Sequence, residues 1–249
     1  MCFRVTRSCN AHCGFCLAPS DGLHPRTQTL KTRIDWLVEH GVRVMHFCGG
    51  EPTIHPGLPA LVAHTHARGA KPKVTTNGIT IGDELLATLA ATPTSVKVSI
   101  HGDRDEHDTL VGRVAYDRTI ANLRRLVRAG VPTAVQTTLV QGNQHVVDDM
   151  VGLCLHEGVR RLSFLPFIAR GDGQVNESRF ALSSAERFDL RAAVKAQRHA
   201  RAGRLDVRWV DFATRPVPVA EVDGTVVLEG ASEALDRTLC RIPDADQVS

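Results

Sequence analysis

Residues 42–78 read VRVMHFCGGEPTIHPGLPALVAHTHARGAKPKVTTNG, and this stretch decides the fold class. Val42–Phe47 is short, largely apolar and followed by a glycine pair, which is typical of a buried β-strand. Leu58–Arg68 has apolar residues at helical spacing and is closed by a glycine. Pro72–Thr76 is again strand-like and runs into the turn dipeptide Asn77-Gly78. A strand, a helix and a second strand joined by short turns predict a right-handed βαβ unit with parallel strands.

The same alternation extends in both directions along the chain. Strands are expected at Phe3–Thr6, Val42–Phe47, Pro72–Thr76, Ser95–Ile100, Thr133–Val140 and Arg161–Pro166. Helices are expected at Leu23–His40, Leu58–Arg68, Asp83–Ala90, Asp117–Ala129, Gln144–His156 and from Ser184 to about Ala202. Repeated βαβ units build one parallel sheet, and six of them are too few for a closed eight-stranded barrel. We therefore predict an α/β fold, an open partial (β/α)6 parallel barrel.

Residues 203–249 break this alternation. Leu205–Phe212 and Thr225–Leu228 are strand-like, and a proline-containing stretch separates them. We expect two units: a barrel domain over residues 1–202, and a small C-terminal extension, residues 203–249, that packs on the barrel and covers one edge of its sheet.

Composition and charge exclude several classes of protein. The chain has 249 residues and a formal net charge of +3, and its basic residues are scattered instead of forming a block, so no nucleic-acid partner is expected. There is no run of 18 apolar residues and no charged-then-apolar leader at the N-terminus, so neither a membrane protein nor a secreted protein is expected. We predict a cytoplasmic location.

Three of the seven cysteines fall within eight residues, directly after the first strand: Cys9, Cys13 and Cys16. In folds of this class ligands bind at the carboxyl ends of the strands, which is where this loop begins. Three thiolates suit an iron–sulfur cluster, or a zinc ion whose fourth ligand is His12 or a distant cysteine. The remaining cysteines are expected to be small buried residues, with Cys48 as an alternative fourth ligand: Cys2, Cys48, Cys154 and Cys240.

The loop and the strand ends together resemble the radical S-adenosylmethionine (radical SAM) superfamily. The spacing C-x3-C-x2-C, with Phe15 before the last cysteine, is similar to the cluster loop of that family, and Gly49-Gly50-Glu51-Pro52 is similar to its motif for the SAM amino group. Further matches follow the next strands in the expected order, so that the resemblance runs from about Phe3 to Arg170: Thr76-Asn77-Gly78, Ser99-Ile100-His101-Gly102, His107-Asp108, Gln136 and Thr138.

The resemblance implies a role for each of these groups. The three cysteines would ligate three irons of a [4Fe-4S] cluster, and SAM would bind the fourth iron. Gly49 and Gly50 would let the backbone approach SAM, and Glu51 would accept a hydrogen bond from its amino group. Further SAM contacts are expected at Phe15, Asn77, Ser99, Gln136, Thr138 and Leu165. One electron from a flavodoxin or ferredoxin would cleave SAM to a 5′-deoxyadenosyl radical that abstracts hydrogen from the substrate.

The substrate is expected to be a small polar metabolite of natural-product biosynthesis. The reason is that the chain shows neither a preceding leader-binding domain nor a cysteine-rich extension. His101, Arg104 and Arg170 are the candidate substrate contacts. The outcome is compatible with an oxidoreductase, an isomerase or a lyase. One alternative is a maturase of a ribosomal peptide, which a free strand edge beside the cavity would favour. The other is a non-catalytic zinc or iron–sulfur binding module.

Overall fold

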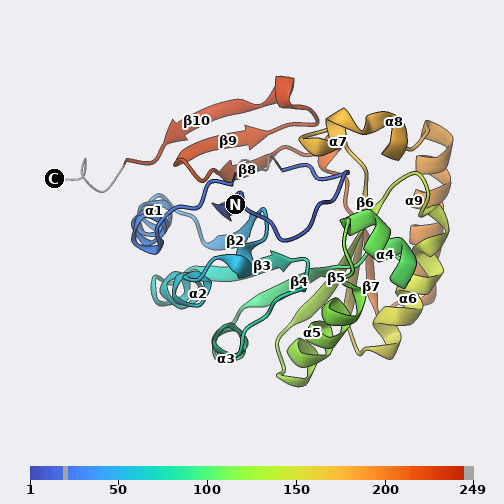
Figure 1. The fold of residues 1–249 in the computed structure, drawn as a ribbon, viewed down its shortest axis with the longest axis horizontal. Coiled ribbons are helices and arrows are strands. Elements are labelled where there is room, and N and C mark those ends of the chain that lie inside the picture. Colours follow the sequence, from blue (N-terminus) through green and yellow to red (C-terminus); the bar gives the residue numbers. More distant parts are fainter. Residues whose placement is uncertain (19–21, 244–249) are drawn as a thin grey trace.

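A computed structural model describes residues 1–18 and 22–243 of the chain. Its helices cover the outer side of a curved sheet, and the loop after the first strand crosses the middle of the molecule (Figure 1). Within the described residues the sheet has ten strands in the order β10-β9-β8-β1-β2-β3-β4-β5-β6-β7. Strands β1 to β7 are parallel to their neighbours, β8 is parallel to β1, and β9 and β10 are antiparallel.

The six expected strand–helix units are present, and they form the open parallel sheet expected of a partial barrel. The strands are β1 (Cys2–Thr6), β2 (Val44–Gly49), β3 (Lys71–Thr76), β4 (Ser95–Ser99), β5 (Thr133–Leu139) and β6 (Arg161–Pro166). The expected helices are α1 (Thr27–Glu39), α2 (Leu58–Ala67), α3 (Asp83–Ala91), α5 (Tyr116–Arg128), α6 (Val147–His156) and α9 (Ser184–Ala200). Three short helices were not expected: α4 (Arg104–Val111), α7 (Asp172–Val175) and α8 (Glu177–Phe180).

Two helix starts differ from the expectation. The first helix was expected from Leu23 but begins at Thr27, because Pro25 disfavours helical backbone in the residue before it and Arg26 is still extended. The fifth expected helix begins with one 3-10 turn over Gln144–Val146 before α6 starts at Val147.

Alternation along the strands separates two chemically different faces of the sheet. The residues that face the helices form the main apolar core, for example Phe3, Phe47, Val74, Val96 and Val98. Because successive side chains in a strand point to opposite faces, their neighbours form an inner face away from the helices. That inner face is polar and carries Cys2, Arg4, His46, Cys48, Lys73, Lys97, Ser99, Gln136 and Thr138.

The C-terminal segment covers both edges of the six-stranded sheet, which corrects the expectation that it covers one. Strand β7 (Asp206–Trp209) pairs with β6, whereas β8 (Val217–Ala220) pairs with β1 and is followed by β9 (Thr225–Glu229) and β10 (Arg237–Arg241). Without these neighbours the outer strands β1 and β6 would have free backbone N–H and C=O groups. Strand β8 supplies hydrogen-bonding partners for β1, and β7 supplies them for β6. The domain boundary at residue 202 stays a prediction.

Outside the cluster loop, the cysteines only partly follow the expectation of burial. Cys154 is buried in the main core, as expected. Cys240 is exposed on β10, so the expectation is wrong there. Cys2 and Cys48 lie on the inner face, where their thiols form a hydrogen bond with each other, and Cys48 is not among the residues that line the cavity of the cluster loop.

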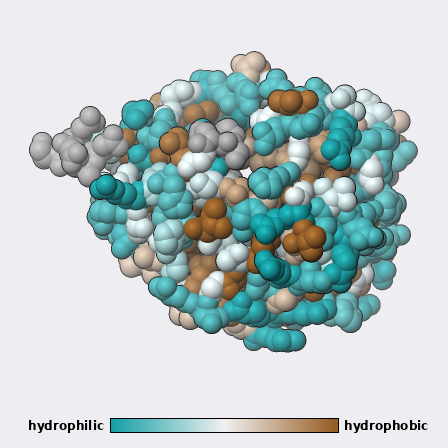
Figure 2. Space-filling view, viewed as in Figure 1, coloured by the Kyte–Doolittle hydropathy of each residue, from teal (hydrophilic) through white to brown (hydrophobic). Residues whose placement is uncertain are grey.

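No helix in the described part of the chain is long and apolar enough to cross a membrane. On the face shown in Figure 2, hydrophobic residues are scattered among hydrophilic ones. The cytoplasmic location stays a prediction.

Candidate active site

The three cysteines of the loop after β1 meet at one cavity. Cys9, Cys13 and Cys16 line a space of about 300 Å³, together with Gly50 from the end of β2 and Asp172 from α7. All three are free thiols. The loop, the glycine pair and α7 therefore converge at the carboxyl ends of the strands, where the sequence placed the chemistry.

Other segments hold this loop in place through its backbone. The N–H of His12 donates to the carbonyl oxygen of Val111 at the end of α4, 2.8 Å away. The N–H of Gly173 donates to the carbonyl oxygen of Cys16 at 3.0 Å, and the side-chain amide of Asn176 donates to Gly14 at 3.0 Å. These anchors from α4 and α7 were missed in the sequence, although Gly171-Asp172-Gly173 after the sixth strand is a signal of close backbone approach.

The glycine pair after β2 is required by the chain itself. A β-carbon on Gly49 would lie 2.1 Å from the carbonyl oxygen of Thr6, and one on Gly50 would lie 2.1 Å from that of Ser8. The N–H groups of Gly50 and Glu51 donate to these same oxygens at 2.8 and 2.9 Å. The glycines therefore let the backbone after β2 pack against the segment that leads into Cys9.

Glu51 is buried and organises the ends of two strands. Its Oε1 accepts hydrogen bonds from the Thr53 N–H at 3.0 Å, the Thr53 hydroxyl at 2.8 Å and the Thr76 hydroxyl at 2.7 Å. Its Oε2 accepts one from the Asn77 N–H at 2.7 Å. Burial raises the pKa of this carboxyl, although these hydrogen bonds lower it in part. Among the described residues Oε2 accepts this one hydrogen bond. Because a carboxylate oxygen accepts about two, Oε2 can accept one more.

The chemistry of the three thiols fits an iron–sulfur cluster. Burial, followed by the two neighbouring thiols, raises the pKa of Cys13, and burial raises the pKa of Cys9 to about 11. Three thiolates in one cavity need a strong positive charge beside them, and metal binding deprotonates such ligands. Among the described residues no three His, Cys, Asp or Glu side chains surround a single metal ion. In an iron–sulfur cluster each iron takes its own thiolate, so the three thiols need not surround one ion.

Four of the expected SAM contacts lie in three different surroundings. Ser99 and Gln136 meet on the inner face, where the Gln136 amide donates to the Ser99 hydroxyl at 2.9 Å. The side-chain amide of Asn77 instead donates to Asn10 in the cluster loop at 2.7 Å, so it positions that loop. Phe15 is buried against Phe180 and, edge to face, against His101 at 4.9 Å between ring centroids.

The remaining expected SAM contacts lie on neighbouring strands. The backbone N–H of Thr138 donates to His101 Nδ1 at 3.1 Å, and Leu165 on β6 is buried. Thr138 and Leu165 are paired residues in the register of β5 and β6.

The three expected substrate contacts are not brought together. His101 is buried beneath Phe15, and burial lowers its pKa to about 3, so its ring is neutral. Arg104 is exposed on α4, forms an ion pair with Asp117 and stacks over Tyr116. Both Arg104 and Arg170 are paired with carboxylates of the protein in this structure, and their role as substrate contacts stays a prediction.

Arg170 is a structural residue. Its guanidinium donates two hydrogen bonds of 2.8 Å to the carboxylate of Asp236, and it also contacts Glu229 at 3.3 Å. Its side chain is only 4% exposed. It therefore ties the loop after β6 to β9 and to the segment before β10, because a planar guanidinium pairs with a carboxylate through two parallel hydrogen bonds.

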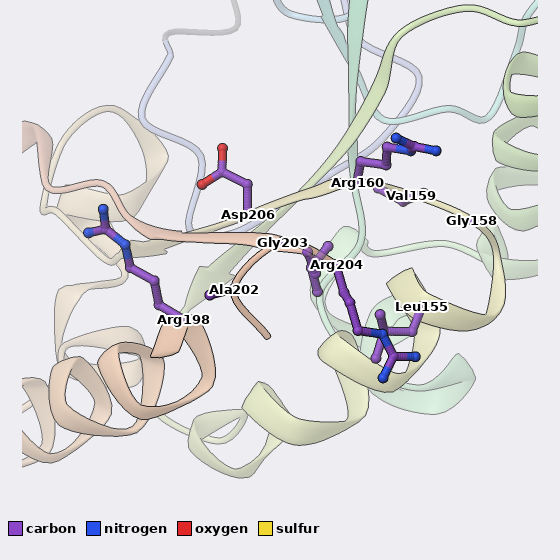
Figure 3. A pocket seen from close by; sticks show the side chains of 10 residues that line it. Leu155, Gly158, Val159, Arg160, Arg198, Ala202, Gly203, Arg204 and Asp206 are labelled. Carbon is purple, nitrogen blue, oxygen red and sulfur yellow. The ribbon is translucent and has the colours of Figure 1, made fainter. Parts of the chain in front are cut away.

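A larger cavity lies away from the cysteines. It has a volume of about 650 Å³ and is lined by residues that precede β6 and β7, including Val159, Arg160, Arg204 and Leu205. Figure 3 shows that the side chains of Arg160, Arg198 and Arg204 point in different directions instead of toward one ligand. Because it lies at the amino ends of these strands, it is not the expected place for the chemistry of this fold.

The model of the Radical SAM superfamily matches residues 3–153. The chain belongs to the radical SAM superfamily. This family uses a [4Fe-4S] cluster and SAM, so the cofactor expectation is confirmed, and the iron–sulfur alternative replaces zinc for the cysteine loop.

Two curated radical SAM relatives extend the match. Fe-coproporphyrin III synthase of Methanosarcina barkeri is 29% identical over 217 residues, which cover 84% of this chain and 54% of the relative. PqqA peptide cyclase of Streptomyces rochei is 30% identical over 240 residues, which cover 92% of this chain and 65% of the relative. The chain thus spans between about half and two thirds of the length of these relatives.

Solved structures support the fold. SuiB of Streptococcus suis bound to precursor peptide SuiA superimposes with a TM-score of 0.72 at 19% identity, covering 84% of this chain and 48% of that one. SuiB has also been solved bound to S-adenosylmethionine, with a TM-score of 0.71. At this level of identity the likeness shows a shared radical SAM fold.

Proposed function

We propose that this chain is the radical SAM part of an enzyme that modifies a ribosomally made precursor peptide. The observation that carries the proposal is the likeness to a PqqA peptide cyclase over 92% of this chain. A fold neighbour bound to a precursor peptide supports it. The alternative of peptide maturation is therefore better supported than the small polar metabolite that the sequence led us to expect.

The sheet offers a feature that suits an extended peptide. In the described part of the chain β10 is the last strand of the sheet, and all five of its residues are exposed. An exposed edge strand presents free N–H and C=O groups that pair with an added strand. The expectation of a small metabolite rested on a missing leader-binding domain and a missing cysteine-rich extension. A chain that spans part of its relatives does not support either reason.

The residues of the site divide the work between them. When bound, a [4Fe-4S] cluster and SAM supply one-electron cleavage of SAM and a carbon radical that abstracts hydrogen from the substrate. Cys9, Cys13 and Cys16 hold the cluster. Glu51, with the glycine pair, fixes the strand ends at which the SAM amino group binds. Ser99 and Gln136 are placed to bind polar groups of SAM, and a flavodoxin or ferredoxin donates the electron.

The proposal is tested by substrate-dependent SAM cleavage. The chain is reconstituted with iron and sulfide without oxygen, then given reductant, SAM and either a pool of synthetic peptides of mixed sequence or a pool of small metabolites that includes a tetrapyrrole. We expect the peptide pool to raise 5′-deoxyadenosine above the substrate-free level and to change the mass of a peptide. Stimulation by the metabolite pool alone would overturn the proposal.

A further inference from the structure

Two lysines on adjacent strands are diagonal neighbours on the inner face of the sheet. Lys73 on β3 alternates with the core residue Val74, and Lys97 on β4 alternates with the core residues Val96 and Val98. Strands β3 and β4 are neighbours in parallel register, with Thr75 opposite Lys97. Both lysines are partly buried and point away from the helices, since alternate residues share one face.

Neither lysine has a carboxylate partner among the described residues. The acidic side chains that approach this face are already paired with arginines: Glu221 and Glu229 with Arg4, and Asp206 with Arg161 and Arg208. Partly buried cations are normally paired, because an unpaired charge loses its hydration without compensation. Two unpaired lysines on one face are therefore a feature that packing alone does not explain.

The other ionisable groups on this face do not neutralise the lysines. Burial, followed by the repulsion of Lys97 and Lys73, lowers the pKa of His46 to about 3, so that ring is uncharged. The hydrogen bond from Cys48 lowers the pKa of the Cys2 thiol. Burial lowers the pKa of Lys97 as well. A neutral imidazole and a thiol are therefore the ionisable groups that lie beside the two lysines.

The lysines lie below the expected SAM contacts. Lys97 precedes Ser99 by two residues on the same face of β4, which is a step of about 7 Å along the strand. Ser99 is in turn hydrogen-bonded to Gln136 on the neighbouring strand β5. Along the inner face, Lys97 therefore lies one step farther from the carboxyl ends of the strands than the expected SAM contacts Ser99 and Gln136.

We propose that Lys73 and Lys97 form an anion subsite that receives an acidic side chain, Asp or Glu, of the peptide substrate. The proposal rests on the proposed function, since it specifies which peptides the enzyme takes. A carboxylate placed between the two ammonium groups satisfies both with charge-assisted hydrogen bonds. It also reduces the electrostatic repulsion between the ammonium groups of Lys73 and Lys97.

The test compares two probe peptides that differ in one charge. Acetyl-Gly-Glu-Gly-amide and acetyl-Gly-Gln-Gly-amide have the same size and shape, and their binding to the cluster-loaded chain with SAM is measured by NMR at low ionic strength, without reductant. We expect the Glu peptide to bind about tenfold more tightly, the value of one hydrogen-bonded charge. Lys97→Met and Lys73→Met should each lose this preference, whereas Lys195→Met, an exposed lysine on α9, should keep it.

The variants should fold, because each removes an unpaired charge from a partly buried position, and the melting temperature checks this directly. Equal binding of the two peptides to the wild-type chain, or a preference that survives in a folded Lys97→Met variant, would overturn the subsite. A preference that depends on both lysines, combined with no peptide-stimulated SAM cleavage, would leave the anion subsite standing and overturn the peptide proposal instead.

Discussion

A β-carbon on Gly50 would lie 2.1 Å from the carbonyl oxygen of Ser8, well inside van der Waals contact. Ser8 is the residue before Cys9, and the N–H of Glu51 donates to the same Ser8 oxygen at 2.9 Å. The end of β2 and the start of the cluster loop are therefore packed backbone to backbone, with no space for a side chain between them.

This contact predicts that Gly50→Ala impairs cluster binding. The added methyl group must push Arg7 and Ser8 away, and with them Cys9, so we expect most of the bound iron to be lost. Iron and sulfide per chain after anaerobic reconstitution measure the effect. Gly152→Ala is the control, because nothing lies within 4 Å of its added carbon and alanine favours the helix by up to about 1 kcal/mol. Normal iron content in Gly50→Ala would contradict the expectation.

Cys13→Ala should abolish the brown colour of the reconstituted protein and all SAM cleavage. This change removes one of the three thiolate ligands of the cluster. Among the described residues, no other cysteine lines the cavity and could take its place. Visible absorbance and 5′-deoxyadenosine are the measurements. Cys240→Ala removes an exposed thiol from β10 and should leave both unchanged. Cleavage that survives in the Cys13 variant would rule out the assignment of the ligands.

Glu51→Gln should weaken SAM binding more than it reduces iron content. If the amide oxygen keeps the three hydrogen bonds at Oε1, the amide nitrogen meets the Asn77 N–H, which is also a donor. An unsatisfied buried donor costs about 1–3 kcal/mol of folding free energy. Equilibrium SAM binding and iron per chain test the comparison, and denaturant unfolding tests the stability cost, with exposed Glu84→Gln on α3 as the control. Wild-type values for both would show that the carboxylate has no special role.

Arg170→Met should loosen the last strands without touching the cluster. It leaves the carboxylate of Asp236 without its arginine and removes one of the two arginines that contact Glu229, the other being Arg4. We expect a loss of about 2–3 kcal/mol of folding free energy, since Asp236 is partly exposed. Hydrogen exchange should increase over residues 225–241. Arg104→Met, which breaks an exposed pair, should leave the melting temperature unchanged. Unchanged exchange in the Arg170 variant would speak against the structural role.

Acid should destabilise the fold from just below neutral pH. Burial lowers the pKa of His101 to about 3 and of His107 to about 4, whereas histidine in the unfolded chain titrates near 6.5. The unfolded state therefore binds more protons, so stability is full above pH 6.5 and falls as the pH drops toward these values. In His101→Asn the side-chain oxygen replaces Nδ1 as the hydrogen-bond acceptor. The slope of the unfolding free energy against pH should then decrease by an amount that corresponds to at most one bound proton. His66→Asn, exposed on α2, should not change it.

The sequence by itself determined the parallel strand–helix order, because strand and helix periodicities and glycine turns are local signals. It also placed the three cysteines and the Gly-Gly-Glu motif at strand ends. The order of these motifs along the chain also indicated the radical SAM superfamily. These features depend on spacing along the chain, and spacing is what a sequence displays.

Only the tertiary structure decided which charged side chains have a partner of opposite charge and which do not. Arg170 was expected to bind substrate, but Asp236, which lies 66 residues away, holds it. Conversely, Lys73 and Lys97 gave no signal in the sequence, and they stand out only because the fold pairs the nearby carboxylates with arginines instead. Whether a charge has a partner depends on contacts between distant segments, because electrostatic pairing and burial follow distance in space and not separation along the chain.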